Sequence, residues 1–205
     1  MEAFESLCEI LLRQAGYWVI PGIYVALNQR DKDFLDETVA LPTLGKRVFK
    51  SFPRTQLDLV AYKPAKNELL IIECKSFLDS PGISARSFPF SRRVSLDRPV
   101  SREDVARFKQ YKLFQHPEYL KVVSDQLIKN LKTLGMLTQD NHPSTRLMLA
   151  CGRLADTSSA PIRDQFRHQG WRFAGPKTIV RGLSRLKNIG YHNDPIVMTA
   201  KLLLR

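Results

Sequence analysis

The chain has 205 residues, of which 43% are hydrophobic and 25% are charged, an ordinary composition for a globular protein. Its formal net charge of +12 is not ordinary and indicates a polyanionic partner, nucleic acid rather than a membrane surface, although part of the excess can serve solubility alone. The longest apolar runs are far below the roughly 18–20 residues that span a bilayer, and the acidic N-terminus does not resemble a signal peptide. We therefore expect no membrane partner.

Residues 3–15 are predicted to form an amphipathic helix, because their apolar side chains recur at helical spacing. A short strand at 17–20 follows, which Pro21-Gly22 should break before it continues at 23–27. Residues 28–53 read as a polar insertion with a short helix near 33–38. The elements expected further along are a hairpin at 54–75, a long loop at 76–102, helices at 101–114 and 118–134, a strand at 146–151, a helix at 160–169, a strand at 171–174, and helices at 176–188 and 195–204.

The hairpin at 54–75 carries the most informative side chains of the chain. Pro64-Ala65-Lys66-Asn67 is a turn signal between two β-rich runs. Folding the chain about the middle of this turn pairs Lys63 with Glu68 and sets Asp58 opposite Glu73. Directly opposed residues of an antiparallel pair have Cβ atoms about 4.5–5.5 Å apart. A register slip of one residue would break this pairing.

Two carboxylates at that separation repel each other unless one is protonated or a cation lies between them. Side chains alternate along a strand, so Glu73 and Lys75 share one face while Leu70, Ile72 and Cys74 share the other. Mg²⁺ commonly binds one or two carboxylates together with water and phosphate oxygens. A nearby lysine can orient or deprotonate the water, or stabilise charge on the phosphate. The pattern predicts metal-dependent phosphodiester cleavage; the alternative is a surface ion pair at a strand end.

The other candidate chemistries lack a pattern. The three cysteines, Cys8, Cys74 and Cys151, are far apart and form no CxxC, so we expect buried thiols rather than disulfides or a zinc site, and a reducing, cytoplasmic location. The histidines are scattered singly. No Gly-rich phosphate loop is present, so no nucleotide cofactor is predicted.

The side chains of the hairpin and of the first predicted helix resemble the motifs of the PD-(D/E)XK, or restriction-endonuclease-like, nuclease superfamily. The matching positions are Asp58 and Glu73-Cys74-Lys75, preceded by a helix with Phe4-Glu5 and a Gly16-Tyr17 turn, which look most like the branch of methyl-directed restriction enzymes and Holliday-junction resolvases. The motifs cover residues 1–75, and beyond them only the order of elements agrees. Leu57 stands where the family often has a proline. The resemblance implies an α/β fold with a restriction-endonuclease-like core, in which helices flank a central mixed β-sheet.

The resemblance also implies a role for each matching residue. Asp58 and Glu73 would bind Mg²⁺ or Mn²⁺, and Lys75 would position or activate water. A glutamate of the first helix often completes the metal shell. Glu2, Glu5 and Glu9 are the candidates, and Glu5 is chosen because it borders the apolar stripe; the alternative is an ordinary solvated acid. A glutamine of the following helix sometimes joins the site, and Gln110 is the candidate here.

Basic residues around the hairpin predict contacts with DNA phosphates. The loop at 76–102 leaves the hairpin directly after Lys75, and Phe88 and Phe90 interleave with its arginines, where they can wedge between or stack on bases. The alternative is a basic loop that the two phenylalanines anchor to the core. The arginines predicted to bind nucleic acid are Arg54, Arg86, Arg92, Arg93 and Arg98.

We expect a single nuclease-like domain at 1–205, with core motifs at 1–75, a basic loop at 76–102 and a C-terminal α/β part at 103–205. The predicted function is a metal-dependent DNA endonuclease. The alternatives are a nucleic-acid-binding or assembly subunit that keeps the fold without cutting, and a general basic scaffold. The partner is DNA, and a homodimer or a partner protein that supplies specificity remains open.

Overall fold

The computed structural model describes residues 2–38, 54–76, 82, 83, 111, 113, 114, 116–155, 159–188 and 194–203. Its strands are β1 (Trp18–Ala26), β2 (Arg54–Lys63), β3 (Glu68–Lys75), β4 (Ser144–Cys151) and β5 (Arg172–Ala174). Its helices are α1 (Ala3–Gln14), α2 (Gln29–Thr38), α4 (Pro117–Thr133), α5 (Ser159–His168), α6 (Pro176–Leu186) and α7 (Pro195–Leu203). None of these helices is both long enough and apolar enough to cross a bilayer.

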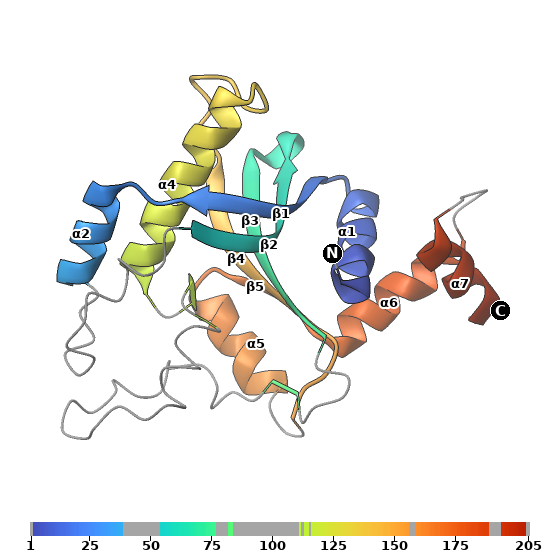
Figure 1. The fold of residues 1–205 in the computed structure, drawn as a ribbon. Helices are drawn as coiled ribbons and strands as arrows, with labels where there is room; N and C mark the ends of the chain where they lie inside the picture. The colour runs from blue at the N-terminus through green and yellow to red at the C-terminus, as the bar shows by residue number, and fades with distance from the viewer. Residues whose placement is uncertain are drawn as a thin grey trace. The chain divides into compact units, whose positions relative to one another are not determined.

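The fold is of the α/β class, as predicted. Its sheet has five strands in the order β1-β2-β3-β4-β5 and helices flank it (Figure 1). Strands β2 and β3 pair antiparallel, whereas β4 and β5 pair parallel, so the sheet is mixed. The mixed sheet is therefore confirmed, while the restriction-endonuclease-like topology stays a prediction.

The chain divides into two compact units that are not consecutive in sequence. The first comprises Met1–Gly22, Asp58–Ala85 and Arg146–Arg205, and the second comprises Ile23–Leu57 and Arg86–Thr145. The chain passes from one unit to the other within β1, β2 and β4. The prediction of one domain over 1–205 stays a prediction.

The core of the first unit lies where the apolar stripe of α1 meets one face of the strands. A capping box between Glu2 and Glu5 starts α1, and Gly16, at φ +80°, lets the chain turn away after its end. The buried residues of this core are Cys8, Leu12, Tyr17, Val19, Leu59, Ala61, Leu70, Ile72, Cys74, Ala150, Ala174 and Ile179. The stripe predicted for residues 3–15 is therefore the buried face of α1.

Helix α6 lies close to α1, and α7 packs against α6 (Figure 1). Gly182 makes the close approach possible, because a Cβ atom there would lie 2.8 Å from a Leu11 methyl carbon. Leu186, Val197 and Ala200 form a second apolar cluster that joins α6 to α7. Leu11 of α1 and Leu183 of α6 contact both this cluster and the core, so the α6–α7 pair is continuous with the core of the unit.

The second unit is built around α4. Asn28 caps α2 by accepting a hydrogen bond from the Asp31 backbone N–H at 2.8 Å. Gln126 of α4 then donates to the Asp31 carboxylate at 2.9 Å. Tyr119, fully buried, shares a hydrogen bond with Thr55 at the start of β2. These contacts, with the buried stripe of α4, hold this unit together.

Two local predictions need correction, and one lies largely outside the described residues. Pro21 and Gly22 do not break the first strand, because β1 is an edge strand of the sheet and an edge position tolerates a proline. The helix predicted near 33–38 begins at Gln29, where Asn28 supplies the cap. Of the helix predicted at 101–114, only Tyr111, Leu113 and Phe114 are described, and all three are helical and buried. The other predicted helices and strands agree within a few residues.

Candidate active site

The hairpin has the turn and the register that the sequence predicts. Pro64–Lys66 form a short 3₁₀ turn, and Asn67 closes it in the left-handed conformation, at φ 45° and ψ 47°. The paired positions run from Lys63 with Glu68 to Leu59 with Ile72. Continued by one residue, this register sets Asp58 opposite Glu73.

Asp58, Glu73 and Lys75 lie together at the far end of this hairpin from the turn. The Lys75 ammonium nitrogen is 2.5 Å from Oε1 of Glu73 and 3.9 Å from Oδ2 of Asp58. The backbone N–H of Cys74 donates to Oδ2 of Asp58 at 2.7 Å, which fixes the orientation of that carboxylate. The three side chains are 18%, 16% and 21% exposed, respectively, so each is mostly shielded but still reaches solvent.

The electrostatic environment keeps Lys75 in its charged form. Burial lowers the pKa of Lys75, but the charge of Glu73, the hydrogen bond to Glu73 and the charge of Asp58 outweigh it and raise the pKa above its ordinary value. An ammonium group is a hydrogen-bond donor and not a base. A charged Lys75 can orient water or stabilise charge on a phosphate.

Glu5 takes part in the N-terminal cap of α1. Its Oε2 accepts the backbone N–H of Glu2 at 3.0 Å in the capping box of α1. Helix α1 packs on the sheet face that carries Ile72 and Cys74, whereas Glu73 points to the opposite face. Among the described residues, no group of three or more His, Cys, Asp or Glu side chains is placed to hold an ion. Glu5 as a third metal ligand stays a prediction.

The cysteines are buried free thiols, as predicted. The hydrogen bond with Cys8, followed by burial, raises the pKa of the Cys74 thiol. Burial also raises the pKa of Cys151, to about 12. Neutral, buried thiols are poor nucleophiles and poor metal ligands, so Cys74 contributes its backbone N–H to the site rather than its sulfur.

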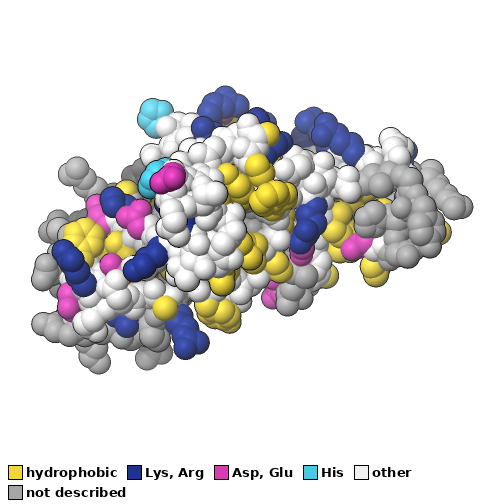
Figure 2. Space-filling model, turned by 90° about the horizontal axis from the view of Figure 1, so that it is seen from above, with side chains coloured by type: hydrophobic (Ala, Val, Ile, Leu, Met, Phe, Trp, Pro, Cys, Tyr) yellow, Lys and Arg dark blue, Asp and Glu magenta, His cyan; other side chains and the backbone are white. Residues whose placement is uncertain are grey.

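Most of the predicted DNA-contact residues lie outside the described residues, namely Arg86, Arg92, Arg93 and Arg98, together with Gln110. Arg54 is described, at the start of β2, and its side chain is exposed. On the face that Figure 2 shows, Lys and Arg side chains form several separate groups rather than one continuous patch. These predictions therefore stay predictions.

A second charged cluster on the same hairpin was not foreseen. Glu68, only 5% exposed, accepts hydrogen bonds from Arg172 at 2.7 and 2.8 Å and from the Tyr17 hydroxyl at 2.7 Å. Arg146 lies 3.6 Å away. Burial and the hydrogen bond to Glu68 raise the pKa of Tyr17 to about 12. The arginine partners of Glu68 come from β4 and β5, and Tyr17 directly precedes β1. These residues are far apart in sequence, so no local sequence pattern indicates the cluster.

Comparison with known proteins returns no relative for this chain: no family model, no curated protein and no solved structure matches it. The resemblance to PD-(D/E)XK nucleases therefore rests on the motif residues alone.

Proposed function

We propose that this protein is a metal-dependent DNA endonuclease that hydrolyses phosphodiester bonds at the Asp58–Glu73–Lys75 cluster. The observation that carries the proposal is the sharing of one lysine by two carboxylates, with Lys75 at 2.5 Å from Glu73 and 3.9 Å from Asp58. Asp58, Glu73 and Lys75 sum to one negative charge in a chain whose net charge is +12. A local cluster of acidic side chains in a basic protein can bind a metal cation that acts on a polyanionic substrate.

The donor set fits Mg²⁺ or Mn²⁺. Both ions accept carboxylate oxygens, and Mg²⁺ usually keeps several water ligands, so two protein carboxylates are sufficient. Oδ2 of Asp58 is taken by the Cys74 N–H, and Oδ1 has no hydrogen-bond partner among the residues described. Asp58 and Glu73 would hold the ion, which when bound supplies an acidified water and charge stabilisation at the phosphate.

The protein groups around the two carboxylates have separate tasks in this proposal. The Cys74 N–H orients Asp58. Lys75, kept charged by Glu73 and Asp58, offers donors to a phosphate oxygen or to the attacking water. The mostly shielded position of the three side chains strengthens these interactions, since fewer water molecules screen the charges.

DNA is the proposed substrate because the charge of the chain matches a phosphate backbone. The proposal is tested by incubating the full chain with supercoiled plasmid, branched DNA and single-stranded DNA in Mg²⁺, Mn²⁺ or EDTA. The variants are Lys75→Ala and Asp58→Ala. Matched controls are Lys121→Ala and Asp125→Ala, which alter an exposed ion pair on α4.

We expect the wild-type protein to cleave DNA only when a metal is present. The cleavage rate should fall by about 10²-fold or more in Lys75→Ala and Asp58→Ala, because loss of a group that stabilises transition-state charge has effects of this size. The two control variants should retain the wild-type rate. Equal cleavage by wild type and all four variants would contradict the proposal. Tight DNA binding with no cleavage under any metal would favour the alternative, a nucleic-acid-binding subunit that keeps the fold.

A further inference from the structure

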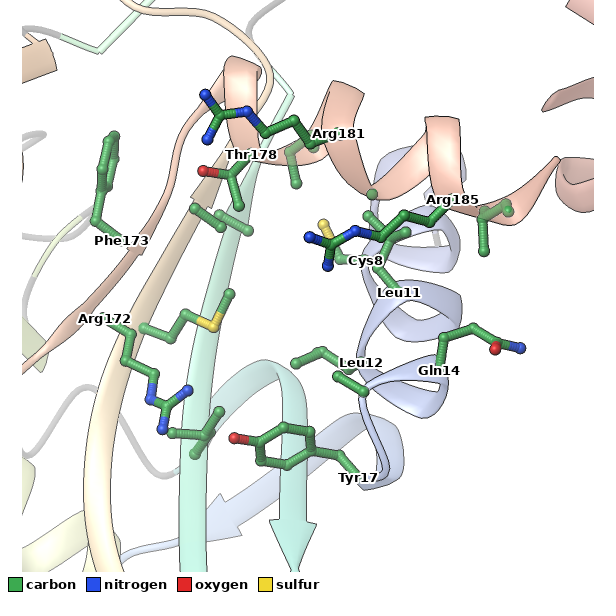
Figure 3. A pocket seen from close by; sticks show the side chains of 18 of the residues that line it. Cys8, Leu11, Leu12, Gln14, Tyr17, Arg172, Phe173, Thr178, Arg181 and Arg185 are labelled. Atoms are coloured by element: carbon green, nitrogen blue, oxygen red, sulfur yellow. The ribbon is translucent and has the colours of Figure 1, made fainter. Parts of the chain in front are cut away.

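The first unit contains a pocket whose lining does not include Asp58, Glu73 or Lys75. It lies between α1, α6 and strands β3 to β5, and its volume is about 730 Å³ (Figure 3). Pockets for small organic ligands fall in the range of about 300–1,000 Å³. The pocket is therefore large enough to hold a ligand of mononucleotide size.

Among the described residues that line this pocket, none is acidic and four are arginines: Arg146, Arg172, Arg181 and Arg185. In Figure 3, Arg172 enters from β5 toward Tyr17, Arg185 extends from α6 over the cavity, and Arg181 lies at the end beside Thr178. Arg181 and Arg185 are four residues apart on one helix, so both project from the same side of α6. The lining therefore presents guanidinium groups from three elements, β4, β5 and α6, to one cavity.

The buried carboxylate of Glu68 holds one side of this arrangement. It fixes Arg172 through two hydrogen bonds and lies 3.6 Å from Arg146. One carboxylate shared by two arginines leaves one positive charge in excess. A guanidinium that is already fixed in position loses less conformational freedom when it binds a ligand.

The other side of the arrangement is unpaired. Arg181 and Arg185 are exposed and have no ion pair or hydrogen bond with any residue the structure describes. Their charges add to the excess left by Arg146 and Arg172. Planar guanidinium groups bind phosphate through paired N–H donors, more specifically than an ammonium group does. The charge and the donor geometry both match a phosphate of two negative charges or more.

The rest of the lining is largely apolar, with a few polar groups. The apolar part of the lining comes from α1, with Leu11 and Leu12, from β5, with Ala174, and from α6, with Ile179. Gln14, Tyr17 and Thr178 supply polar atoms at the edges. An inorganic anion would leave this apolar surface uncovered, whereas an organic phosphate would cover it.

We propose that the pocket binds an organic phosphate of mononucleotide size, with the phosphate groups at the arginines and the organic part against Leu11 and Leu12. The site is separate from the hairpin carboxylates. Leu70 of β3 lines the pocket, while Glu73 and Lys75 point to the opposite face of the same strand. No Gly-rich phosphate loop is involved, so the ligand is held by side chains and not by a nucleotide-hydrolysing motif.

The test is calorimetric titration of the full chain, in EDTA and about 0.15 M salt, with adenosine 5′-diphosphate, pyrophosphate and adenosine. Arg181→Gln/Arg185→Gln removes the unpaired charges. Thr178→Phe narrows the pocket without changing the charge. Arg163→Gln/Lys177→Gln is the matched control, because both residues are exposed and lie outside the lining. Thermal unfolding checks that each variant folds.

We expect saturable binding of adenosine 5′-diphosphate at one site, weaker binding of pyrophosphate, and no binding of adenosine. The affinity of Arg181→Gln/Arg185→Gln for adenosine 5′-diphosphate should fall about tenfold or more, because two charge-assisted contacts are lost. The affinity of Thr178→Phe should fall as well. The affinity of the control variant should stay within about twofold of the wild-type value. An equal loss in the control, which would indicate non-specific electrostatics, would overturn the proposal. So would the absence of saturable binding, or unchanged binding by Thr178→Phe.

Discussion

The two charged ends of the β2–β3 hairpin differ in which charge is in excess. Near the turn, one acid, Glu68, is surrounded by Arg146, Arg172 and a tyrosine hydroxyl. At the other end, two acids, Asp58 and Glu73, both lie within ion-pair distance of Lys75. The first cluster is almost fully buried at its acid, while the second reaches solvent.

This difference separates a cluster that we expect to stabilise the fold from the cluster proposed to bind a metal. Every oxygen of Glu68 has a donor, so the carboxylate is compensated and its surplus arginine charge faces a pocket. Asp58 and Glu73 are two like charges beside Lys75, and like charges this close repel each other unless a cation lies between them. Groups of side chains that lower the stability of the fold in this way often occur at functional sites.

The largest expected effect on stability comes from Glu68→Ala. This substitution leaves Arg172 and the Tyr17 hydroxyl without their acceptor, and breaking a buried ion pair in this way costs roughly 3 kcal/mol of unfolding free energy. Urea unfolding followed by circular dichroism measures the change. A loss below about 1 kcal/mol would mean that the cluster is not a stabilising one.

The next effect is a pH dependence that belongs to Glu68. Burial by itself raises the pKa of Glu68, but the hydrogen bonds from Tyr17 and Arg172 and the charges of Arg172 and Arg146 outweigh it and lower the pKa below its ordinary value of 4.5. The stabilisation is therefore fully present above about pH 4.5 and is lost as the pH falls through the lower folded value.

Glu68→Gln should remove this contribution, so its unfolding free energy should fall less steeply than that of wild type as the pH drops below 4.5. Urea unfolding at a series of acidic pH values gives both slopes. Asp125→Asn, which alters an exposed pair on α4, should follow the wild-type slope. Parallel curves for Glu68→Gln and wild type would count against this assignment.

The smallest effect on stability is expected at the end of the hairpin that carries Asp58, Glu73 and Lys75. Asp58→Asn keeps an oxygen to accept the Cys74 N–H and removes one of two repelling charges, while Lys75 keeps its close partner Glu73. The unfolding free energy should change by no more than about 1 kcal/mol, the range of partly exposed ion pairs. A loss as large as that of Glu68→Ala would erase the distinction between the two ends.

The hairpin was predictable because its information is local. Turn residues at 64–67 and the alternation of side chains fix the register, and the register brings Asp58 to Glu73. The Glu68 cluster and the arginine pocket were not predictable, since Tyr17, Glu68 and Arg172 are far apart in sequence and meet only through strand order. The continuity of β1 depends likewise on its edge position, which Pro21 and Gly22 do not reveal.

The most direct test of the central claim is a titration of the metal-free chain with Mn²⁺, followed by electron paramagnetic resonance of the free ion. The account predicts one class of site in wild type that Asp58→Asn and Glu73→Gln each lose, and that Asp125→Asn keeps. Mn²⁺ binding that is the same in all four proteins, or absent from wild type, would contradict the assignment of the hairpin carboxylates as a metal site.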